Sequence, residues 1–220
     1  MNHRCDVAIV GAGPVGSLLG ILLRDYGLSV VLVEKDLVPY QLPRAIVMDD
    51  EIQQVFHAHG MGSRLDAMVT PMRGADFVRP NGEKILGIDI PPKGPLGFPP
   101  VVSHFQPDLD AMTQHEAEQR GATLLRGRTA TALAQDTGSV HLTLDNGDTV
   151  DSRWLVGCDG ASSWTRRTVG LTLDDLSFDQ QWFVVDVQLK PGRGGSLPGV
   201  TQQVCSPDRP TTYVPGHAQY

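Results

Sequence analysis

Cysteine, aromatic side chains and positive charge are all scarce in this sequence of 220 residues. The three cysteines (Cys5, Cys158 and Cys205) have no metal-type spacing, so we expect no metal site. An odd and sparse set of cysteines also fits a reducing cytoplasm, which is the expected location. Because the net charge is −7 and no basic run is present, the sequence argues against nucleic acid as a partner.

Long apolar runs are absent as well. None approaches the roughly 20 residues that a membrane-spanning helix needs, so we expect no membrane partner. The N-terminal apolar segment is interrupted by glycines and lacks the layout of a signal peptide, so it belongs to the fold. With 40% hydrophobic and 20% charged residues, the composition is ordinary for a soluble globular protein.

The stretch that organises the chain runs from residue 5 to residue 34. A short apolar run rich in β-branched residues predicts a buried strand, and it leads directly into a G-x-G-x-x-G turn. A leucine-rich helix and a second apolar strand follow the turn. The four parts are the strand, turn, helix and strand at residues 5–10, 11–16, 17–26 and 28–33. This order predicts a βαβ dinucleotide-binding unit.

Each residue of the turn has a mechanical reason to be there. Gly11 permits the tight turn, Gly13 lets a pyrophosphate approach the backbone, and Gly16 allows close packing of helix on strand. Pro14 suits the first helical turn, which it shares with Val15, because its missing N–H is not needed there. The free N–H groups and the positive helix end then attract phosphates.

Glu34 ends the second strand, where its carboxylate can accept hydrogen bonds from the ribose hydroxyls of an adenosine. Its charge disfavours a 2′-phosphate, so the resident nucleotide should be FAD or NAD and not NADP. Lys35, the next residue, is a further candidate contact. The alternative is an ordinary βαβ unit without a ligand, but the strand, the helix and the acid at this spacing favour the nucleotide.

Two further residues are candidates for the same ligand. Arg44 follows the unit, and its guanidinium could reach a pyrophosphate through a forked pair of hydrogen bonds; the alternative is a solvated surface arginine. Asp159 follows an apolar strand at residues 154–158, next to Gly160 and a predicted helix start. Ligands bind at that edge of open α/β sheets, but Asp159 could equally cap the helix.

The remaining elements follow from turn, capping and periodicity signals. We expect a helix capped by Asp49 or Asp50 and ending at His59, a second helix at 107–121, and a hairpin around Asn81-Gly82. His141 should be a solvent-facing strand residue. Other strands or extended pieces are expected at 101–106, 122–125, 129–134, 140–144, 181–190, 200–205 and 211–214, with a turn at 191–198.

Three separated signals together resemble the FAD-dependent aromatic hydroxylases, the single-component flavoprotein monooxygenases. They are residues 11–16 with Glu34, residues 43–45, and residues 158–160 with the arginine pair 166–167. The resemblance is closest to the 3-(3-hydroxyphenyl)propionate hydroxylase group. The stretches that carry this closer likeness are 43–46, 49–51, 106–107 and 181–186.

The resemblance implies an α/β fold with a Rossmann-like FAD-binding domain and a β-sheet substrate domain that is incomplete at its C-terminus. The implied boundaries are 1–74 and 101–175 for the FAD-binding domain, and 75–100 and 176–220 for the substrate domain. It also implies roles: Glu34 would hold the adenosine ribose, and Arg44 would lie near the pyrophosphate and ribityl chain. Gln106 would contact the ribityl region, and Asp159 would serve FAD and the passage of NAD(P)H.

The implied reaction is hydroxylation of a phenolic or other aromatic substrate. NADH or NADPH would reduce FAD, and O2 would form a C4a-hydroperoxyflavin that gives one oxygen atom to the ring. The catalytic base is not assigned; the candidates are His57, His59, His104 and His217. The expected partners are a small aromatic substrate and O2, and a homodimer is compatible with the sequence.

Two alternatives stay open. One is another flavoenzyme on the same scaffold, such as an epoxidase or a halogenase. The other is a truncated, non-catalytic FAD-binding protein, because the family's proteins are longer and carry a second flavin fingerprint, Gly-Asp before a helix, that is missing here. We therefore expect a fragment, a truncated product or a half that needs a partner, with weak FAD binding and poor hydroxylation by these 220 residues alone.

Overall fold

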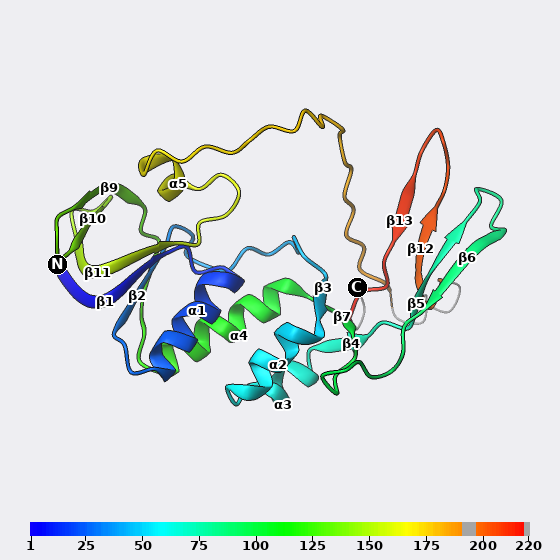
Figure 1. Ribbon diagram of the computed structural model, residues 1–220, viewed down its shortest axis with the longest axis horizontal. Helices are drawn as coiled ribbons and strands as arrows, with labels where there is room; N and C mark the ends of the chain where they lie inside the picture. The colour runs from blue at the N-terminus through cyan, green and yellow to red at the C-terminus, as the bar shows by residue number, and fades with distance from the viewer. Residues whose placement is uncertain (191–196, 218–220) are drawn as a thin grey trace. The chain divides into compact units, whose positions relative to one another are not determined.

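The structure is a computed structural model that describes residues 1–190 and 197–217. The chain divides into two compact units (Figure 1). The first unit comprises Met1–Gln41 and Pro107–Phe183, and the second comprises Leu42–Gln106 and Val184–Tyr220. Among the helices of the described residues, none has the length and apolar character needed to cross a bilayer.

The first unit is built on a six-stranded sheet with the order β8-β2-β1-β11-β10-β9. The first four strands in that order run parallel, and β10 and β9 are antiparallel additions. The bounds are β1 Asn2–Val10, β2 Val30–Glu34, β8 Thr123–Arg126, β9 Ala130–Gln135, β10 Val140–Leu144 and β11 Thr149–Gly157.

Strand β2 is apolar from Val30 to Val33, and these four consecutive residues are all buried, so both faces of the strand are covered. Five strands of the sheet contribute valine, leucine and alanine side chains to one buried core. Its members are Ala8, Val10, Val31, Val33, Ala130, Leu142, Leu144 and Val150. The parallel register pairs Val10 with Val33 and with Gly157, so the carboxyl ends of β1, β2 and β11 meet at one edge.

Two helices of this unit lie side by side, α1 (Pro14–Asp25) and α4 (Gln106–Gln119) (Figure 1). Their C-terminal ends are joined by Arg120, whose guanidinium contacts Asp25 at 2.6 Å, and by Arg24, which donates to the carbonyl of Arg120 at 2.8 Å. Gly27 has a φ of +81° just beyond α1, the left-handed conformation in which helices commonly end. A short helix, α5 (Trp164–Thr168), follows β11.

In its described residues, the second unit contains two small sheets and two helices. The four-stranded sheet has the order β13-β12-β5-β6, and the three-stranded sheet has the order β3-β7-β4. The buried side chains of Phe56, Met61 and Leu65 form part of its core. The bounds are β3 Val47–Asp49, α2 Asp50–Ala58, α3 Gly62–Asp66, β4 Val69–Pro71, β5 Gly74–Val78, β6 Lys84–Asp89, β7 Val101–His104, β12 Thr201–Val204 and β13 Thr211–Tyr213.

Most of the predicted elements are confirmed within a few residues. Asp49 caps α2 by accepting from the N–H of Ile52 at 3.0 Å, and β5 and β6 form the predicted hairpin with Gly82 at a φ of +87°. Three short elements, β3, α3 and β4, were not predicted, because segments of three to five residues show no readable periodicity.

The predicted strand at residues 181–190 is wrong. This segment has no regular secondary structure, and Trp182 and Phe183 are 78% and 92% exposed. An alternating apolar pattern favours a strand, but a strand also needs a neighbour to pair its backbone groups, and the described residues supply none here. Most of the predicted turn at 191–198 lies outside the described residues.

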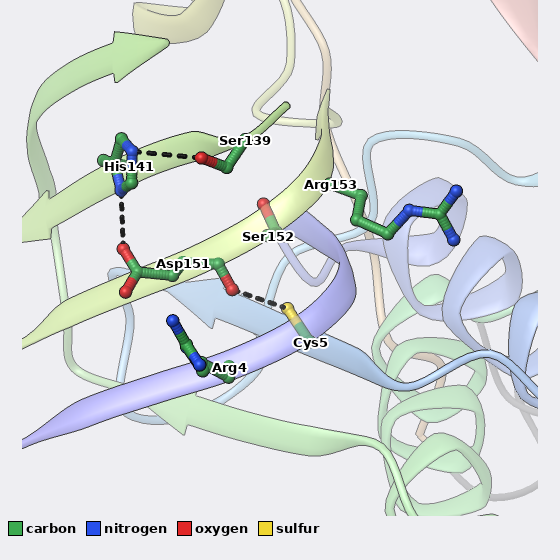
Figure 2. Close-up of a pocket in the computed structure, with 7 residues that line it drawn as sticks. All are labelled: Arg4, Cys5, Ser139, His141, Asp151, Ser152 and Arg153. Carbon is green, nitrogen blue, oxygen red and sulfur yellow. Dashed lines mark hydrogen bonds and ion pairs between the residues drawn. The ribbon is translucent and has the colours of Figure 1, made fainter. Parts of the chain in front are cut away.

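His141 is exposed on β10, as predicted, and it joins two carboxylates. Its Nδ1 lies 2.7 Å from Asp151, and its Nε2 lies 3.2 Å from the Ser139 hydroxyl (Figure 2). The same Nε2 lies 3.4 Å from Asp136. These contacts raise the pKa of His141, chiefly through the hydrogen bond to Asp151 and then through that to Asp136. They therefore link the start of β11 to the β9–β10 turn.

This arrangement predicts that His141 stabilises the fold in a pH-dependent way. Because the folded pKa is raised, the contribution is full below the ordinary value of 6.5 and is lost as pH rises through the raised pKa. In urea unfolding, His141→Gln should therefore lower the midpoint at about pH 5.5 and have little effect at about pH 9. His115→Gln, which removes an exposed histidine from α4, is the control; an equal loss at both pH values for His141→Gln would contradict the prediction.

Candidate nucleotide-binding site

The glycine-rich turn lies at the carboxyl edge of the parallel strands. The N–H of Gly11 donates to the carbonyl of Val33 at 2.8 Å, and the N–H of Cys158 donates to the carbonyl of Val10 at 2.7 Å. These two bonds extend the ladders past the strand ends. They bring the turn, the tip of β2 and the start of the 158–160 segment to the same place.

Gly11 and Gly16 are required by the chain's own packing. Gly11 has a φ of +97°, and a Cβ built on it would lie 2.7 Å from the carbonyl carbon of Cys158 and 2.9 Å from the nitrogen of Asp159. A Cβ on Gly16 would collide with the carbonyl oxygen of Gly11. Any larger residue at either position would push the helix or the 158–159 backbone away from the turn.

Gly13 is different, because nothing in the protein requires it to be glycine. Its φ of −68° and ψ of −171° suit any residue, and no atom lies within 4 Å of a Cβ built on it. The missing side chain therefore leaves open space over the backbone, and such a cradle fits the close approach of a pyrophosphate.

The start of α1 is suited to an anion. Gly13 is its N-cap without a side-chain cap, Pro14 occupies the first turn, and that turn holds no acidic residue. Val15 is 69% exposed beside it. The positive end of the helix dipole and the unpaired N–H groups of the first turn favour a phosphate at this position.

Glu34 connects the tip of β2 to the turn. Its Oε2 accepts from the N–H of Ala12 at 2.8 Å, and its Oε1 accepts from the N–H of Asp36 at 3.0 Å. An ionised carboxylate has about four lone-pair positions, so acceptor capacity for ribose hydroxyls is left over. The neighbouring Lys35 is exposed and pairs with Asp36 at 2.8 Å.

Asp159 supports the start of α5 but is not its cap, so the predicted capping role is wrong. Its carboxylate accepts from the hydroxyl of Ser163, and from the N–H and hydroxyl of Thr165 at 2.9 and 3.1 Å. Ser163, and not Asp159, is the N-cap of α5. Burial opposes ionisation of Asp159, but the hydrogen bonds from Ser163 and Thr165 outweigh it and hold the pKa below its ordinary value.

Arg44 and Gln106 meet in the second unit. Gln106 is only 5% exposed, and its Oε1 accepts from the backbone N–H groups of both Arg44 and Ala45, each at 2.8 Å. The N–H of His104 adds a third bond to this segment, at 3.0 Å to the carbonyl of Ile46. Gln106 therefore fixes the backbone that carries Arg44.

The geometry assigns none of the four candidate histidines as a base. His57 pairs with Asp66 at 3.0 Å, and His217 bonds the hydroxyl of Thr70 at 2.8 Å. His104 is buried, and that burial, with a smaller effect of His217, lowers its pKa.

Sequence reasoning missed Gln114. This buried residue of α4 donates from its Nε2 to the carbonyl of Ala12 at 2.7 Å, across 102 positions of sequence. A glutamine in a helix carries no local signal of such a contact, because the fold alone brings α4 to the turn. A pocket of about 210 Å³ around Arg4 and Cys5 lies at the opposite end of β1 and is not part of this site (Figure 2).

Comparison with known proteins decides the family. Residues 4–196 match the family model described as FAD binding domain. The chain belongs to this FAD-binding family. FAD is thus the nucleotide of this family, and the choice between FAD and NAD left by Glu34 is resolved.

The curated relatives are named as hydroxylases. The chain is 34% identical over 196 residues to 3-(3-hydroxy-phenyl)propionate/3-hydroxycinnamic acid hydroxylase of Klebsiella pneumoniae, covering 87% of this chain and 35% of that protein. It is 33% identical over 217 residues to a probable NADH-specific resorcinol 4-hydroxylase of Rhodococcus jostii, covering 95% and 40%. The resemblance to aromatic hydroxylases is confirmed, and the chain spans well under half the length of these relatives.

Solved structures show the same fold. The flavin-dependent monooxygenase PieE, determined with FAD and substrate, has a TM-score of 0.70 at 26% identity, covering 78% of this chain and 33% of that one. The anhydrotetracycline hydroxylase OxyS of Streptomyces rimosus has a TM-score of 0.65 at 29% identity, covering 76% and 34%. The predicted fold class, a Rossmann-like FAD-binding fold, is therefore confirmed.

The glycine turn predicts a contrast between two substitutions. Gly16→Ala should destabilise the protein by about 2 kcal/mol or more, because its methyl group meets the backbone of Gly11. Gly13→Ala should cost at most about 1 kcal/mol, the loss typical of an N-cap, because its methyl group enters open space. Urea unfolding followed by circular dichroism measures both free energies of unfolding. Equal losses of stability in the two variants would contradict the prediction.

Gln106 predicts a second contrast. Gln106→Leu should destabilise the protein by about 2 kcal/mol, because it leaves two backbone N–H groups without their acceptor. Gln106→Glu keeps an acceptor oxygen and should lose clearly less. Hydrogen exchange of the amides of Arg44 and Ala45 gives the direct readout, with fast exchange in the leucine variant only; protected amides in that variant would contradict the assignment.

Proposed function

We propose that the protein is the FAD-binding part of a monooxygenase that hydroxylates a phenolic or other aromatic substrate with NADH or NADPH and O2. Two supports come from the comparisons: membership of the FAD-binding family and likeness to relatives named as hydroxylases of phenolic compounds. Because the chain covers 35–40% of those relatives, the activity is proposed for the whole protein to which such a chain corresponds.

The observation that carries the proposal is Gly13. Packing explains Gly11 and Gly16 but does not account for Gly13, and a ligand that approaches the backbone there would account for it. A helix start without acidic residues supplies the matching electrostatics for a pyrophosphate. The turn is thus better explained by a dinucleotide than by the ligand-free βαβ alternative.

The residues divide by the part of FAD that they would hold. The turn from Gly11 to Gly16, with Pro14 and Val15 in it, would receive the pyrophosphate, and Glu34 with Lys35 would lie at the adenosine ribose. Arg44 would approach the pyrophosphate and ribityl chain from a backbone that Gln106 holds in place. Asp159 would act indirectly, by fixing the start of α5 beside Gly11.

The chemistry divides between cofactor and protein. Bound FAD would accept electrons from the nicotinamide and activate O2, as flavins do. The chain's own residues bind and orient the cofactor. Residues 1–74 with 101–175 would form the FAD-binding domain, and 75–100 with 176–220 part of the substrate sheet. NADH is favoured as reductant only by the name of the Rhodococcus relative, and a homodimer stays a prediction.

One alternative is a protein that binds FAD without turning over a substrate. It shares the glycine-rich turn with a hydroxylase and differs from it in the turnover assay. An epoxidase or halogenase on the same scaffold shares every feature of the turn and is separated from a hydroxylase only by its product.

Titration of flavin fluorescence tests the proposal. We expect saturable but weak FAD binding to the purified chain, and roughly 10-fold weaker binding by Gly13→Ala, whose methyl group occupies the space meant for the pyrophosphate. NADH oxidation is then followed with resorcinol and with 3-(3-hydroxyphenyl)propionate. Absence of FAD binding would refute the proposal, whereas saturable binding without phenol-stimulated NADH oxidation, even after addition of the remaining part of a relative, would favour the non-catalytic alternative.

A further inference from the structure

The side chain of Gln114 connects α4 to the glycine-rich turn. It is 3% exposed, and its Nε2 donates to the carbonyl oxygen of Ala12 at 2.7 Å. Its Oε1 accepts from the guanidinium of Arg126 at the end of β8. A second nitrogen of Arg126 contacts Glu118 on α4 at 3.1 Å, which holds the guanidinium in place.

Arg126 decides which way the amide of Gln114 points. A guanidinium can only donate, so the oxygen of the amide must face Arg126 and the nitrogen must face Ala12. The contact with Ala12 is therefore made by a donor whose orientation is fixed from its far side. Arg126 also pairs with Glu34 in the register of β2 and β8, so the network reaches the tip of β2.

Ala12 has both of its backbone polar groups engaged. Its carbonyl accepts from Gln114 and from the buried hydroxyl of Ser17 at 2.8 Å, and its N–H donates to Glu34 at 2.8 Å. The two donors on the carbonyl come from α1 and from α4. Together they fix the plane of the peptide that joins Ala12 to Gly13.

The orientation of that peptide determines the direction of the Gly13 N–H. The peptide is trans and planar, so its C=O and N–H bonds point in opposite directions. With the carbonyl held by Ser17 and Gln114, the N–H of Gly13 must point away from both. Among the described residues it finds no acceptor, and Gly13 carries no side chain that could cover it.

We propose that Gln114 is a positioning residue that holds the Gly13 N–H in the direction of the pyrophosphate of a bound dinucleotide. The inference rests on the proposed function, because it takes the ligand to be FAD. Gln114 itself touches neither phosphate nor flavin. It acts through the Ala12 carbonyl, so that the donor is already oriented when the anion arrives.

A buried glutamine could also be merely structural, and the two roles predict different ligand dependence. If the role is structural, replacing Gln114 lowers stability and weakens the binding of every ligand equally or of none. If Gln114 is a positioning residue, its replacement weakens the binding of ligands that carry a pyrophosphate and leaves the binding of the others unchanged. FAD, ADP and adenosine form a series that separates these cases.

The experiment compares Gln114→Met with Thr113→Val. The first removes the donor at nearly equal volume. The second is a matched control, because Thr113 is equally buried on α4 but bonds only carbonyls of its own helix, those of Leu109 and Asp110. We expect Gln114→Met to bind FAD and ADP roughly 10-fold more weakly than the unaltered chain, with adenosine within about twofold. Thr113→Val should leave all three affinities in their original ratios.

Two further variants and a spectroscopic readout complete the test. Gln114→Glu keeps the acceptor for Arg126 but loses the donor, so it should weaken ADP binding as Gln114→Met does. Ser17→Ala combined with Gln114→Met should weaken ADP binding further, because the Ala12 carbonyl then has neither donor. The amide resonance of Gly13 in a 15N–1H spectrum of the ligand-free chain should shift in Gln114→Met and stay in place in Thr113→Val.

The outcomes separate this inference from the proposed function. Suppose that the unaltered chain binds ADP. If Gln114→Met then lowers the affinities for ADP and adenosine equally, or lowers neither, the positioning role is refuted while the proposed function stands. An unmoved Gly13 resonance in Gln114→Met would refute it as well. If the unaltered chain binds neither FAD nor ADP, the proposed function fails first, and the inference fails with it.

Discussion

The close backbone approach at Gly11 is the constraint on which the first unit depends. At this point β1 turns into α1 while the chain leaving β11 passes within a distance that no Cβ could share. Because of this approach, the pairing of β1 with β2 and that of β1 with β11 end at the same edge. The N–H groups of Gly11 and Cys158 donate the last hydrogen bonds of these two pairings. The glycine turn, Glu34 and Asp159 therefore lie at one sheet edge.

Hydrogen bonds then fix the backbone at that edge before any ligand is bound. Glu34, Ser17 and Gln114 engage both polar groups of Ala12, and Asp159 holds the start of α5. Each bond contributes only about 1 kcal/mol to stability. Their larger consequence is geometric, because they leave the N–H of Gly13 oriented and unused at the positive end of a helix. In the second unit, Gln106 fixes the segment of Arg44 by the same means.

At residues 171–190 the local sequence pattern and the tertiary structure disagree, because the segment has no regular secondary structure. It carries large apolar side chains, among them Leu176, Phe178, Trp182 and Phe183, which are 72–92% exposed. Residues 181–190 alternate as a strand should, yet they stay unpaired, since pairing needs a partner that the described residues do not provide. The matched relatives are more than twice as long as this chain. The alternating pattern is thus present in the sequence, but no strand of the described residues pairs with this segment.

The sequence by itself determined the βαβ unit, the glycine turn, Glu34, the hairpin at Asn81-Gly82 and the start of α2 at Asp49 or Asp50. These features depend on neighbours in the chain, on periodicity and on backbone conformations that only certain residues adopt. Tertiary structure alone decided that Gln114 reaches Ala12, that Gln106 holds Arg44 and Ala45, and that Ser163 caps α5 while Asp159 supports it. It also separated Gly13 from Gly11 and Gly16. The three look alike in a motif, and only the space around each shows that packing requires Gly11 and Gly16 and leaves open space at Gly13.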